Sequence, residues 1–482
     1  MAHIIIWNTF NSTTNDRGQT NPTPTGAYRA CGPHSMSSWM AQFGYTIKVI
    51  DFCHLMAPED LIAITKRHIN NETVAIGCSS TFWKNFYKEP TRYEEPDWIV
   101  SPRKKLQKEF KNLDWLLGGQ IESFTSRMWQ FKWVRFAGYS ESTLLKYLDT
   151  KFGEDIPRPP FDIAKLGNHY RPDAGIKSFE VLPIQLNRGC IFKCAFCRAP
   201  LLGKKKDEYL RNLELVEQEL IYNYETFGVT RYYFTDDTVN ETQEKVAALA
   251  AMAERLPFRL EWVGYLRVDL IASYPDTIDL LRRSGLRGCF FGIETFNPTS
   301  AMMIGKGWNG KKAKDFLIEL KKAWGTDVAF SLSLIVGFPD DTPEFLDETQ
   351  KWLIESEMHA WIWQPLYLSS IPTLVDKSKF EQDAEKYGYT FPDKERQHFK
   401  WTNKNWTNLT AITKANELTY EKYPYEKIAG WKLAEFAGAM ESSMDDIIFK
   451  LTPDLDEIDL WPTVRRHIAD YVKFQLEYEI EL

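Results

Sequence analysis

Short, almost continuous apolar runs recur through the first third of the chain and alternate with stretches of helical periodicity. The strand-like runs lie at residues 3–8, 46–52, 73–80 and 113–119. Residues 35–43 and 58–69 have helical patterns, and Pro58 stands at a position favoured at helix starts. Buried strands that alternate with helices predict a doubly wound parallel sheet, which binds ligands beyond the carboxyl ends of its strands.

The same alternation resumes in the middle of the chain. The strand-like runs there lie at residues 180–187, 231–237, 258–266, 288–295, 328–338 and 360–368. Helical patterns separate them, for example at 212–228 and 343–357. These strand–helix units are too few for a closed eight-stranded barrel and predict a partial (β/α)6 TIM barrel. In such barrels the chemistry gathers at the carboxyl ends of the strands.

A proline-bearing segment at 153–175 has the composition of a linker between the two parts. The last part has mostly helical patterns, as at 409–423 and 461–480, and we expect it to cap the barrel or to close over its mouth. The predicted fold class is therefore α/β. The expected domains are a Rossmann-like domain at 1–165, the partial barrel at 176–370 and a mostly helical C-terminal region at 371–482.

Composition narrows the class of protein. A chain of 482 residues is too long for one ordinary core. The net charge of −7 provides no general attraction for nucleic acid or an anionic membrane, so neither is an expected partner. No apolar run approaches the length of a membrane span, and the first residues lack the pattern of a signal peptide. We therefore expect a cytoplasmic, reducing location, where clustered cysteines favour metal binding or catalysis over disulfides.

Aromatic residues are abundant, with 17 Trp, 22 Tyr and 30 Phe. They are compatible with large cores and equally with a pocket walled by rings. Trp361, Trp363, Trp401 and Trp406 illustrate both possibilities, as a wall over the barrel mouth or as interior packing.

Three cysteines fall within eight positions just after the first predicted barrel strand. Cys190, Cys194 and Cys197 have the spacing C-x3-C-x2-C. A structural zinc needs a fourth ligand, but no Cys or His follows closely, and His169 precedes the strand. An iron–sulfur cluster can use three protein thiolates and leave one iron open. The spacing therefore favours an iron–sulfur cluster, with zinc as the alternative.

The stretch "NRGCIFKCAFC" resembles the cysteine loop of the radical S-adenosylmethionine (SAM) superfamily, with Phe196 as the aromatic residue before the last cysteine. The resemblance implies that Cys190, Cys194 and Cys197 hold a [4Fe–4S] cluster whose open iron chelates SAM. One-electron reduction, by a donor such as a flavodoxin, would then yield a 5′-deoxyadenosyl radical. Phe196 would contact SAM.

The resemblance extends through the predicted barrel and implies further SAM contacts. In "FTDDT", Asp236 and Asp237 match the strand end where the amino group of SAM is met. Arg267 in "LRVDLI" is placed to pair with a carboxylate, and Glu294 in "FFGIETFNP" to contact the ribose or the amino group. Gly337 in "IVGFPDDTPE" matches the turn that lines the adenine. An Asp pair or a single Glu at a strand end is more often a helix cap or a surface pair, so these positions are informative only as an ordered set after the cysteine loop.

The first domain resembles the cobalamin-binding domain that precedes the barrel in one large branch of this superfamily, with "VAIGCSST" and "LLGG" among the matching pieces. The candidate cobalamin contacts are Tyr28, Ser79, Thr81, Gly118, Gly119, Gly138 and Glu141. The Asp-x-His-x-x-Gly motif that ligates cobalt is absent, and "GYSE" replaces the usual Gly-Glu-Gly-Glu. The alternative is a domain that keeps the fold without cobalamin.

The resemblance therefore implies a cobalamin-dependent radical SAM enzyme that transfers a methyl group to an unactivated carbon of a small-molecule substrate. Ring contraction and cyclisation by the same cofactors are alternatives. A tRNA methylthiotransferase would use Cys31, Cys53 and Cys78 for a second cluster, but the motifs around them and a terminal β-rich RNA-binding domain are missing. A nucleic-acid-binding protein with a structural metal conflicts with the acidic balance.

Overall fold

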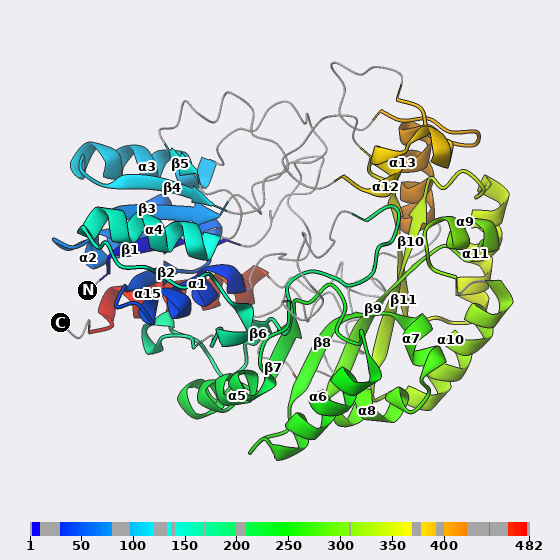
Figure 1. The fold of residues 1–482 in the computed structure, drawn as a ribbon, viewed down its shortest axis with the longest axis horizontal. Coiled ribbons are helices and arrows are strands. Elements are labelled where there is room, and N and C mark those ends of the chain that lie inside the picture. Colours follow the sequence, from blue (N-terminus) through cyan, green and yellow to red (C-terminus); the bar gives the residue numbers. More distant parts are fainter. Residues whose placement is uncertain are drawn as a thin grey trace.

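Two parallel sheets organise the chain (Figure 1). The computed structural model describes residues 2–9, 29–79, 97–118, 133–135, 140–167, 169–197, 209–307, 310–368, 377–391, 400–421, 443 and 461–479. The five-stranded first sheet has the order β2-β1-β3-β4-β5, and the six-stranded second sheet has the order β11-β10-β9-β8-β7-β6. The α/β class expected from the sequence is confirmed.

The first sheet contains the four strands that the apolar runs predict. Its strands are β1 (Ile4–Trp7), β2 (Ile47–Ile50), β3 (Ala75–Ser79), β4 (Asp114–Gly118) and β5 (Trp133–Arg135). Every neighbouring pair is parallel. Both faces are buried, because Ile4 packs in one core and Ile5, its neighbour, in the other. Burial on both faces explains why these strands are mostly apolar, without a regular alternation of apolar and polar residues.

Helices cover both faces of the first sheet. The helices are α1 (Cys31–Ala41), α2 (Pro58–His68), α3 (Asp97–Glu109) and α4 (Ser140–Phe152), with the short η1 (Cys53–Leu55) before α2. Trp39 of α1 and Leu148 of α4 share one core with the sheet. Ile64 of α2 and Leu106 of α3 belong to the core on the opposite face. This arrangement is the doubly wound sheet that the sequence predicts.

The second sheet is an open barrel of strands in sequential order. Its strands are β6 (Val181–Ile184), β7 (Arg231–Phe234), β8 (Glu261–Leu266), β9 (Leu286–Glu294), β10 (Ala329–Val336) and β11 (Ala360–Pro365). All neighbours are parallel. Figure 1 shows the curved sheet with its helices along the outer side. The partial barrel expected from the sequence is thus confirmed.

The barrel helices begin and end at residues suited to those positions. They are α5 (Leu213–Phe227), α6 (Gln243–Arg255), α7 (Val268–Ser273), α8 (Thr277–Arg283), α9 (Pro298–Met303), α10 (Gly310–Trp324) and α11 (Pro343–Glu355). The side chain of Asn212 accepts a hydrogen bond from the N–H of Glu214 and caps α5, which ends at Gly228 with φ of 73°. Thr342 caps α11, and Pro343 occupies its first turn.

The C-terminal part divides between the two sheets, which differs from the expected cap over the barrel. The elements α12 (Lys379–Gln382), η6 (Glu385–Tyr387), α13 (Asn408–Asn416) and η7 (Glu417–Glu421) follow the barrel, and α13 packs on β11. The last helix, α15 (Trp461–Glu477), packs instead against α2 of the first sheet, and its Ile468 and Tyr471 complete that core. An amphipathic helix pattern reveals an apolar face but not which sheet covers it.

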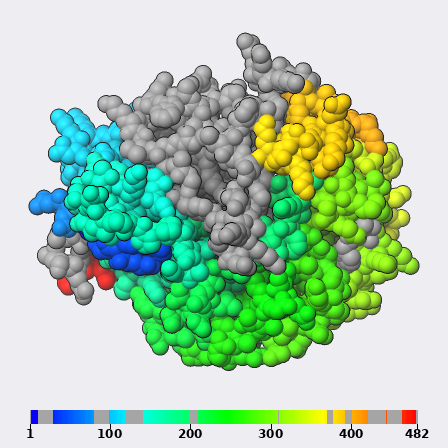
Figure 2. Space-filling view, viewed as in Figure 1, coloured from blue at the N-terminus to red at the C-terminus, as the bar shows by residue number. Residues whose placement is uncertain are grey.

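The segment between the sheets is packed rather than free. It contains η3 (Ile163–Lys165) and η4 (Pro172–Ala174). The buried Tyr170 donates its hydroxyl hydrogen to the carbonyl of Pro183, and the guanidinium of Arg211 donates to the carbonyl of Leu166. Figure 2 shows the blue-to-cyan surface of the first part of the chain beside the green surface of the barrel. None of the helices in the described ranges is both long and apolar enough to span a membrane.

Candidate functional site: the cysteine loop and the facing sheet edge

The cysteine loop leaves the carboxyl end of β6 and is fixed by backbone hydrogen bonds. Gly189 has φ of 98°, which is readily available only to glycine, and turns the chain into Cys190. The N–H of Ala195 donates to the carbonyl of Ile304 at 3.0 Å, and the N–H of Phe380 donates to the carbonyl of Ala195 at 3.1 Å. The loop is therefore held from both the β9 side and the C-terminal part.

The three cysteines of this loop are free thiols. Cys190 and Cys194 are half-buried, whereas Cys197 is exposed. The sulfur of Cys190 lies 3.5 Å from the hydroxyl of Thr238, and burial raises the pKa of the Cys190 thiol. Nη1 of Arg267 lies 3.5 Å from the sulfur of Cys194. A positively charged side chain therefore lies beside the sulfur of Cys194.

Asp236 fixes the backbone at the start of the cysteine loop. Its carboxylate accepts hydrogen bonds from the N–H of Leu186, at 3.0 and 3.1 Å, and of Asn187, at 2.6 Å. Burial raises the pKa of Asp236 to about 6, although Lys245 and these N–H groups act in the opposite direction. Both oxygens are thus engaged by backbone at the start of the loop. Asp237 is exposed.

Glu294 ends β9 in the left-handed region, with φ of 67°. Non-glycine residues rarely adopt this conformation, and it often occurs at functional sites. Its carboxylate pairs with the amino group of Lys306 at 2.9 Å, and Lys306 also donates to the carbonyl of Gly292 at 2.5 Å. A Cβ at position 292 would lie 2.4 Å from the carboxylate of Glu294, so a side chain there would displace this carboxylate from its present position.

Gly337 lies in the turn after β10, with φ of 129°. Its carbonyl accepts hydrogen bonds from the hydroxyl of Tyr389 and the side-chain amide of Asn403. A Cβ at this position would approach the ring of Trp401 to 2.7 Å. The next residue, Phe338, lies near Phe196 of the cysteine loop, with ring centroids 6.2 Å apart. The turn therefore reaches the cysteine loop through two aromatic rings.

The tryptophans compatible with an aromatic wall lie in the interior. Trp361, Trp363, Trp401 and Trp406 belong to the barrel core. The indole N–H groups of Trp361 and Trp363 both donate to the side-chain oxygen of Gln350. Interior packing is therefore the correct interpretation for these four residues.

The candidate cobalamin contacts are only partly within the described residues. Ser79 and Gly118 end β3 and β4 as register partners, at the carboxyl edge of the first sheet. Tyr28, Thr81, Gly119 and Gly138 lie outside the described residues. Glu141, near the start of α4, is buried and pairs with Arg188 of the cysteine loop at 2.8 Å. This ion pair joins the first sheet directly to the loop that carries the cysteines.

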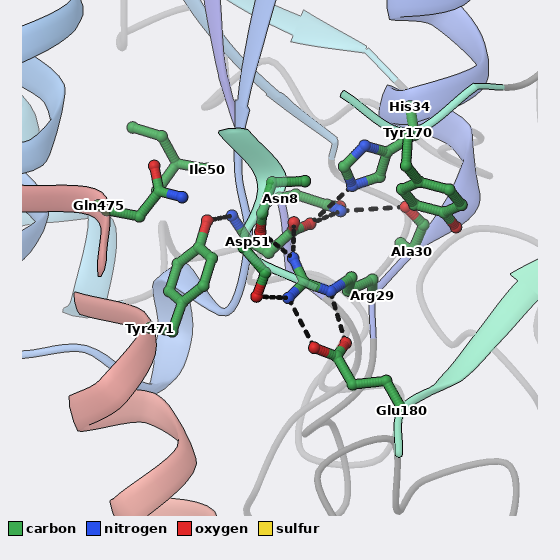
Figure 3. Close-up of polar contacts among 12 residues, drawn as sticks. Asn8, Arg29, Ala30, His34, Ile50, Asp51, Tyr170, Glu180, Tyr471 and Gln475 are labelled. Atoms are coloured by element: carbon green, nitrogen blue, oxygen red, sulfur yellow. Dashed lines mark hydrogen bonds and ion pairs between the residues drawn. The ribbon is translucent and has the colours of Figure 1, made fainter. Parts of the chain in front are cut away.

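A buried polar network, missed at the sequence level, joins the two sheets and the last helix (Figure 3). Nη1 of Arg29 donates to Asp51 at 2.5 Å and to the carbonyl of Ala174 at 2.9 Å. Its Nε and Nη2 donate to the two carboxylate oxygens of Glu180 at 2.6 and 3.0 Å. Nη2 also donates to the carbonyl of Gly175 at 3.3 Å. The whole guanidinium fork is thus used internally, which makes Arg29 a structural residue.

Asp51 connects this network to the sheet edge and to α15. Its carboxylate accepts from Asn8 at 2.6 Å and lies 3.0 Å from Nε2 of His34, while its N–H donates to the hydroxyl of Tyr471. Burial acts to raise the pKa of Asp51, but His34 and Arg29 outweigh burial and hold this pKa well below its usual value. The sequence around Asp51 does not indicate these partners, because most of them are distant from it in the chain.

The donor set of the cysteine loop fits an iron–sulfur cluster. Among the residues that the structure describes, no three His, Cys, Asp or Glu side chains gather closely enough to hold one metal ion. A cluster binds each thiolate through a different iron, so its ligands need not converge on one point. Cys53 and Cys78, required for a second cluster by the methylthiotransferase alternative, are instead buried in the core of the first sheet.

The family model described as "Radical SAM superfamily" matches residues 184–353, from the end of β6 into α11. An uncharacterised methyltransferase of Pyrococcus horikoshii is 27% identical over 199 residues, or 41% of each chain. A bacteriochlorophyllide d C-12(1)-methyltransferase of Chlorobaculum tepidum is 22% identical over 306 residues, or 62% of this chain and 61% of its own. The chain thus spans between 41% and 61% of the length of these two relatives.

Among solved structures, the radical S-adenosylmethionine methyltransferase TsrM from Kitasatospora setae has a similar fold. Its complex with tryptophan substrate and a SAM analog gives a TM-score of 0.57 at 14% identity, over 80% of this chain and 77% of TsrM. TsrM has also been solved with cobalamin and a [4Fe–4S] cluster bound. Residues 184–353 therefore match the radical SAM superfamily model, and most of the chain shares the fold of TsrM.

Proposed function

We propose that this protein is a cobalamin-dependent radical SAM methyltransferase that transfers a methyl group to an unactivated carbon of a small molecule. The likeness to TsrM carries the proposal, because it covers 80% of the chain, far more than residues 184–353. Two of the curated relatives are methyltransferases. A one-electron donor such as a flavodoxin is part of the proposal, because the reaction requires an electron of low potential.

Cys190, Cys194 and Cys197 would hold the [4Fe–4S] cluster. When bound, this cluster supplies the electron that cleaves SAM to a 5′-deoxyadenosyl radical, and cobalamin supplies a carrier for the methyl group. Asp236 contributes by fixing the start of the cysteine loop through the backbone N–H groups of Leu186 and Asn187. We assign it this bracing role in place of the predicted contact with the amino group of SAM.

Glu294 remains the better candidate for a SAM contact. Its strained backbone and its pairing with Lys306 fix the direction of the carboxylate at the carboxyl end of β9. Phe196 and Phe338 form an apolar patch between the cysteine loop and the turn at Gly337, and such a patch excludes water. A closely packed site also matters because a carbon radical of this kind can abstract hydrogen from C–H bonds within reach.

Ser79, Gly118 and Glu141 would face cobalamin at the carboxyl edge of the first sheet. Glu141 supports this placement in a specific way, because its ion pair with Arg188 brings that edge against the cysteine loop. Tyr28, Thr81, Gly119 and Gly138 remain sequence predictions for the same cofactor. The two cofactors would thus lie close to each other, as methyl transfer requires.

The test is anaerobic purification with cobalamin and reconstituted iron, followed by visible spectroscopy, iron analysis and assay of 5′-deoxyadenosine. We expect about four irons per chain, retained corrinoid absorbance, and 5′-deoxyadenosine formation with dithionite. A triple Cys190→Ala, Cys194→Ala, Cys197→Ala variant should lose the iron and the nucleoside product. Cys289→Ala, at a buried position of β9, is the matched control and should keep both. Nucleoside formation by the triple variant would refute the cluster assignment.

A further inference from the structure

Arg267 is fixed in place by its backbone before its side chain makes any contact. It follows β8 and caps the start of α7. Its N–H donates to the side-chain oxygen of Asn240 at 2.8 Å, and its carbonyl accepts from the side-chain nitrogen of Asn240 at 2.9 Å. Asn240 is buried, so this reciprocal pair holds Arg267 at the carboxyl end of the barrel strands.

Three contacts aim the guanidinium of Arg267 at the cysteine loop. Nε and Nη2 donate to the two carboxylate oxygens of Asp269 at 3.1 and 2.6 Å. The plane lies over the ring of Phe192, with the guanidinium carbon 4.1 Å from the ring centroid. With that edge and that face occupied, Nη1 points to the sulfur of Cys194 at 3.5 Å. Phe192 and Cys194 both belong to the cysteine loop.

The sequence resemblance implies a pairing of Arg267 with a SAM carboxylate, and the contacts of Arg267 favour a different role. A SAM carboxylate could form a bidentate pair only with the edge formed by Nη1 and Nη2, and Nη1 is directed at Cys194. Asp269 already occupies the edge formed by Nε and Nη2. The contact with Cys194 is instead one that a cluster ligand would keep when iron is bound.

We propose that Arg267 sets the reduction potential of the cluster by donating a hydrogen bond to the sulfur of Cys194 and by placing a buried positive charge beside it. This inference rests on the proposed function, since it requires the cluster. Reduction adds one electron from the external donor, and no proton needs to move. Reduction makes the cluster more negative. A nearby cation in a partly buried site therefore stabilises the reduced cluster more strongly than the oxidised cluster. Arg267 therefore raises the potential and makes reduction easier.

The test is an EPR-monitored redox titration of the reconstituted protein and three variants. Arg267→Gln removes the charge and should lower the equilibrium constant for reduction at least tenfold, which corresponds to 59 mV for a one-electron couple. Asp269→Asn removes the neighbouring negative charge and should raise the potential. Arg255→Gln is the matched control, because Arg255 makes a similar fork with Glu217 on the exposed surface of the same barrel.

The outcomes separate this inference from the proposed function. A wild-type protein that binds no iron refutes the proposed function itself. Full iron content in every variant, with the potential of Arg267→Gln equal to that of Arg255→Gln, refutes only the role of Arg267. If Arg267→Gln does not fold, the reduction potentials of Asp269→Asn and Arg267→Lys decide. A potential of Asp269→Asn above that of the wild type supports the role of Arg267, and an unchanged or lower potential refutes it. Arg267→Lys keeps the positive charge, so its equilibrium constant for reduction should fall by less than the tenfold expected for loss of the charge.

Discussion

Removing the guanidinium of Arg29 should weaken the junction between the two sheets. Arg29→Met keeps an unbranched chain of similar length but deletes every hydrogen bond of the fork. The side chains of Asp51 and Glu180 are 0% and 2% exposed, so both carboxylates would remain buried without their cation. Breaking a buried ion pair by removing one partner costs about 3–5 kcal/mol. That loss is a large part of the usual stability of a folded protein.

The assay is urea unfolding of the anaerobically prepared protein, followed by tryptophan fluorescence. With a slope of about 3 kcal/mol per M, the first transition should move to lower urea by about 1 to 2 M. A triple Arg29→Met, Asp51→Asn, Glu180→Gln variant removes all three charges and should be more stable than Arg29→Met alone, because the penalty comes from unpaired buried charge. Arg255→Met, at the surface, is the control and should leave the transition in place.

Two results would contradict this reasoning. If Arg29→Met unfolds at the wild-type urea concentration, the network does not hold the junction. If the triple variant is less stable than the single one, the loss arises from missing contacts and not from unpaired charge.

Two further predictions concern single positions. Burial raises the pKa of Glu241 to about 7; since this lies above the unfolded value, the wild-type protein loses stability as the pH rises through about 7. The side chain of Glu241→Gln cannot ionise. In the metal-free protein, the melting temperature of this variant minus that of the wild type should therefore be higher at pH 8 than at pH 5. The same difference at both pH values would contradict the prediction. Gly337→Ala should destabilise the protein by about 1–3 kcal/mol, because it combines a positive φ with a contact of 2.7 Å to Trp401. Gly32→Ala meets nothing within 4 Å, and an equal loss of stability for both variants would contradict the explanation.

Most strands of both sheets could be predicted because parallel strands buried on both faces are predominantly apolar. The exception, β5, has only three residues, Trp133–Arg135, which is too short for a periodic signal. The prediction that the last helix covers the barrel was wrong, because the sequence of a helix reveals its apolar face but not the sheet against which that face packs. The core of the first sheet that receives Ile468 and Tyr471 is separated from them by most of the chain.

The positions of the site residues could be predicted from the sequence better than their roles. Asp236 and Arg267 follow β7 and β8, and Glu294 is the last residue of β9, so pattern and resemblance could place all three at one edge of the barrel. The roles depend on partners that no local pattern reveals. Asp236 is engaged by backbone N–H groups, and Arg267 by Asp269 and by Cys194. Likewise, the pairing of Glu141 with Arg188 joins residues 47 positions apart and emerges only from the folded chain.

The most direct test of the proposed chemistry is the EPR spectrum of the reduced protein with and without SAM. The central claim is that three cysteines leave one iron open for SAM. We predict a spectrum of a reduced [4Fe–4S] cluster that changes when SAM is added, with about four irons per chain. A spectrum that SAM leaves unchanged, or a protein that contains one zinc and no iron, would contradict the claim.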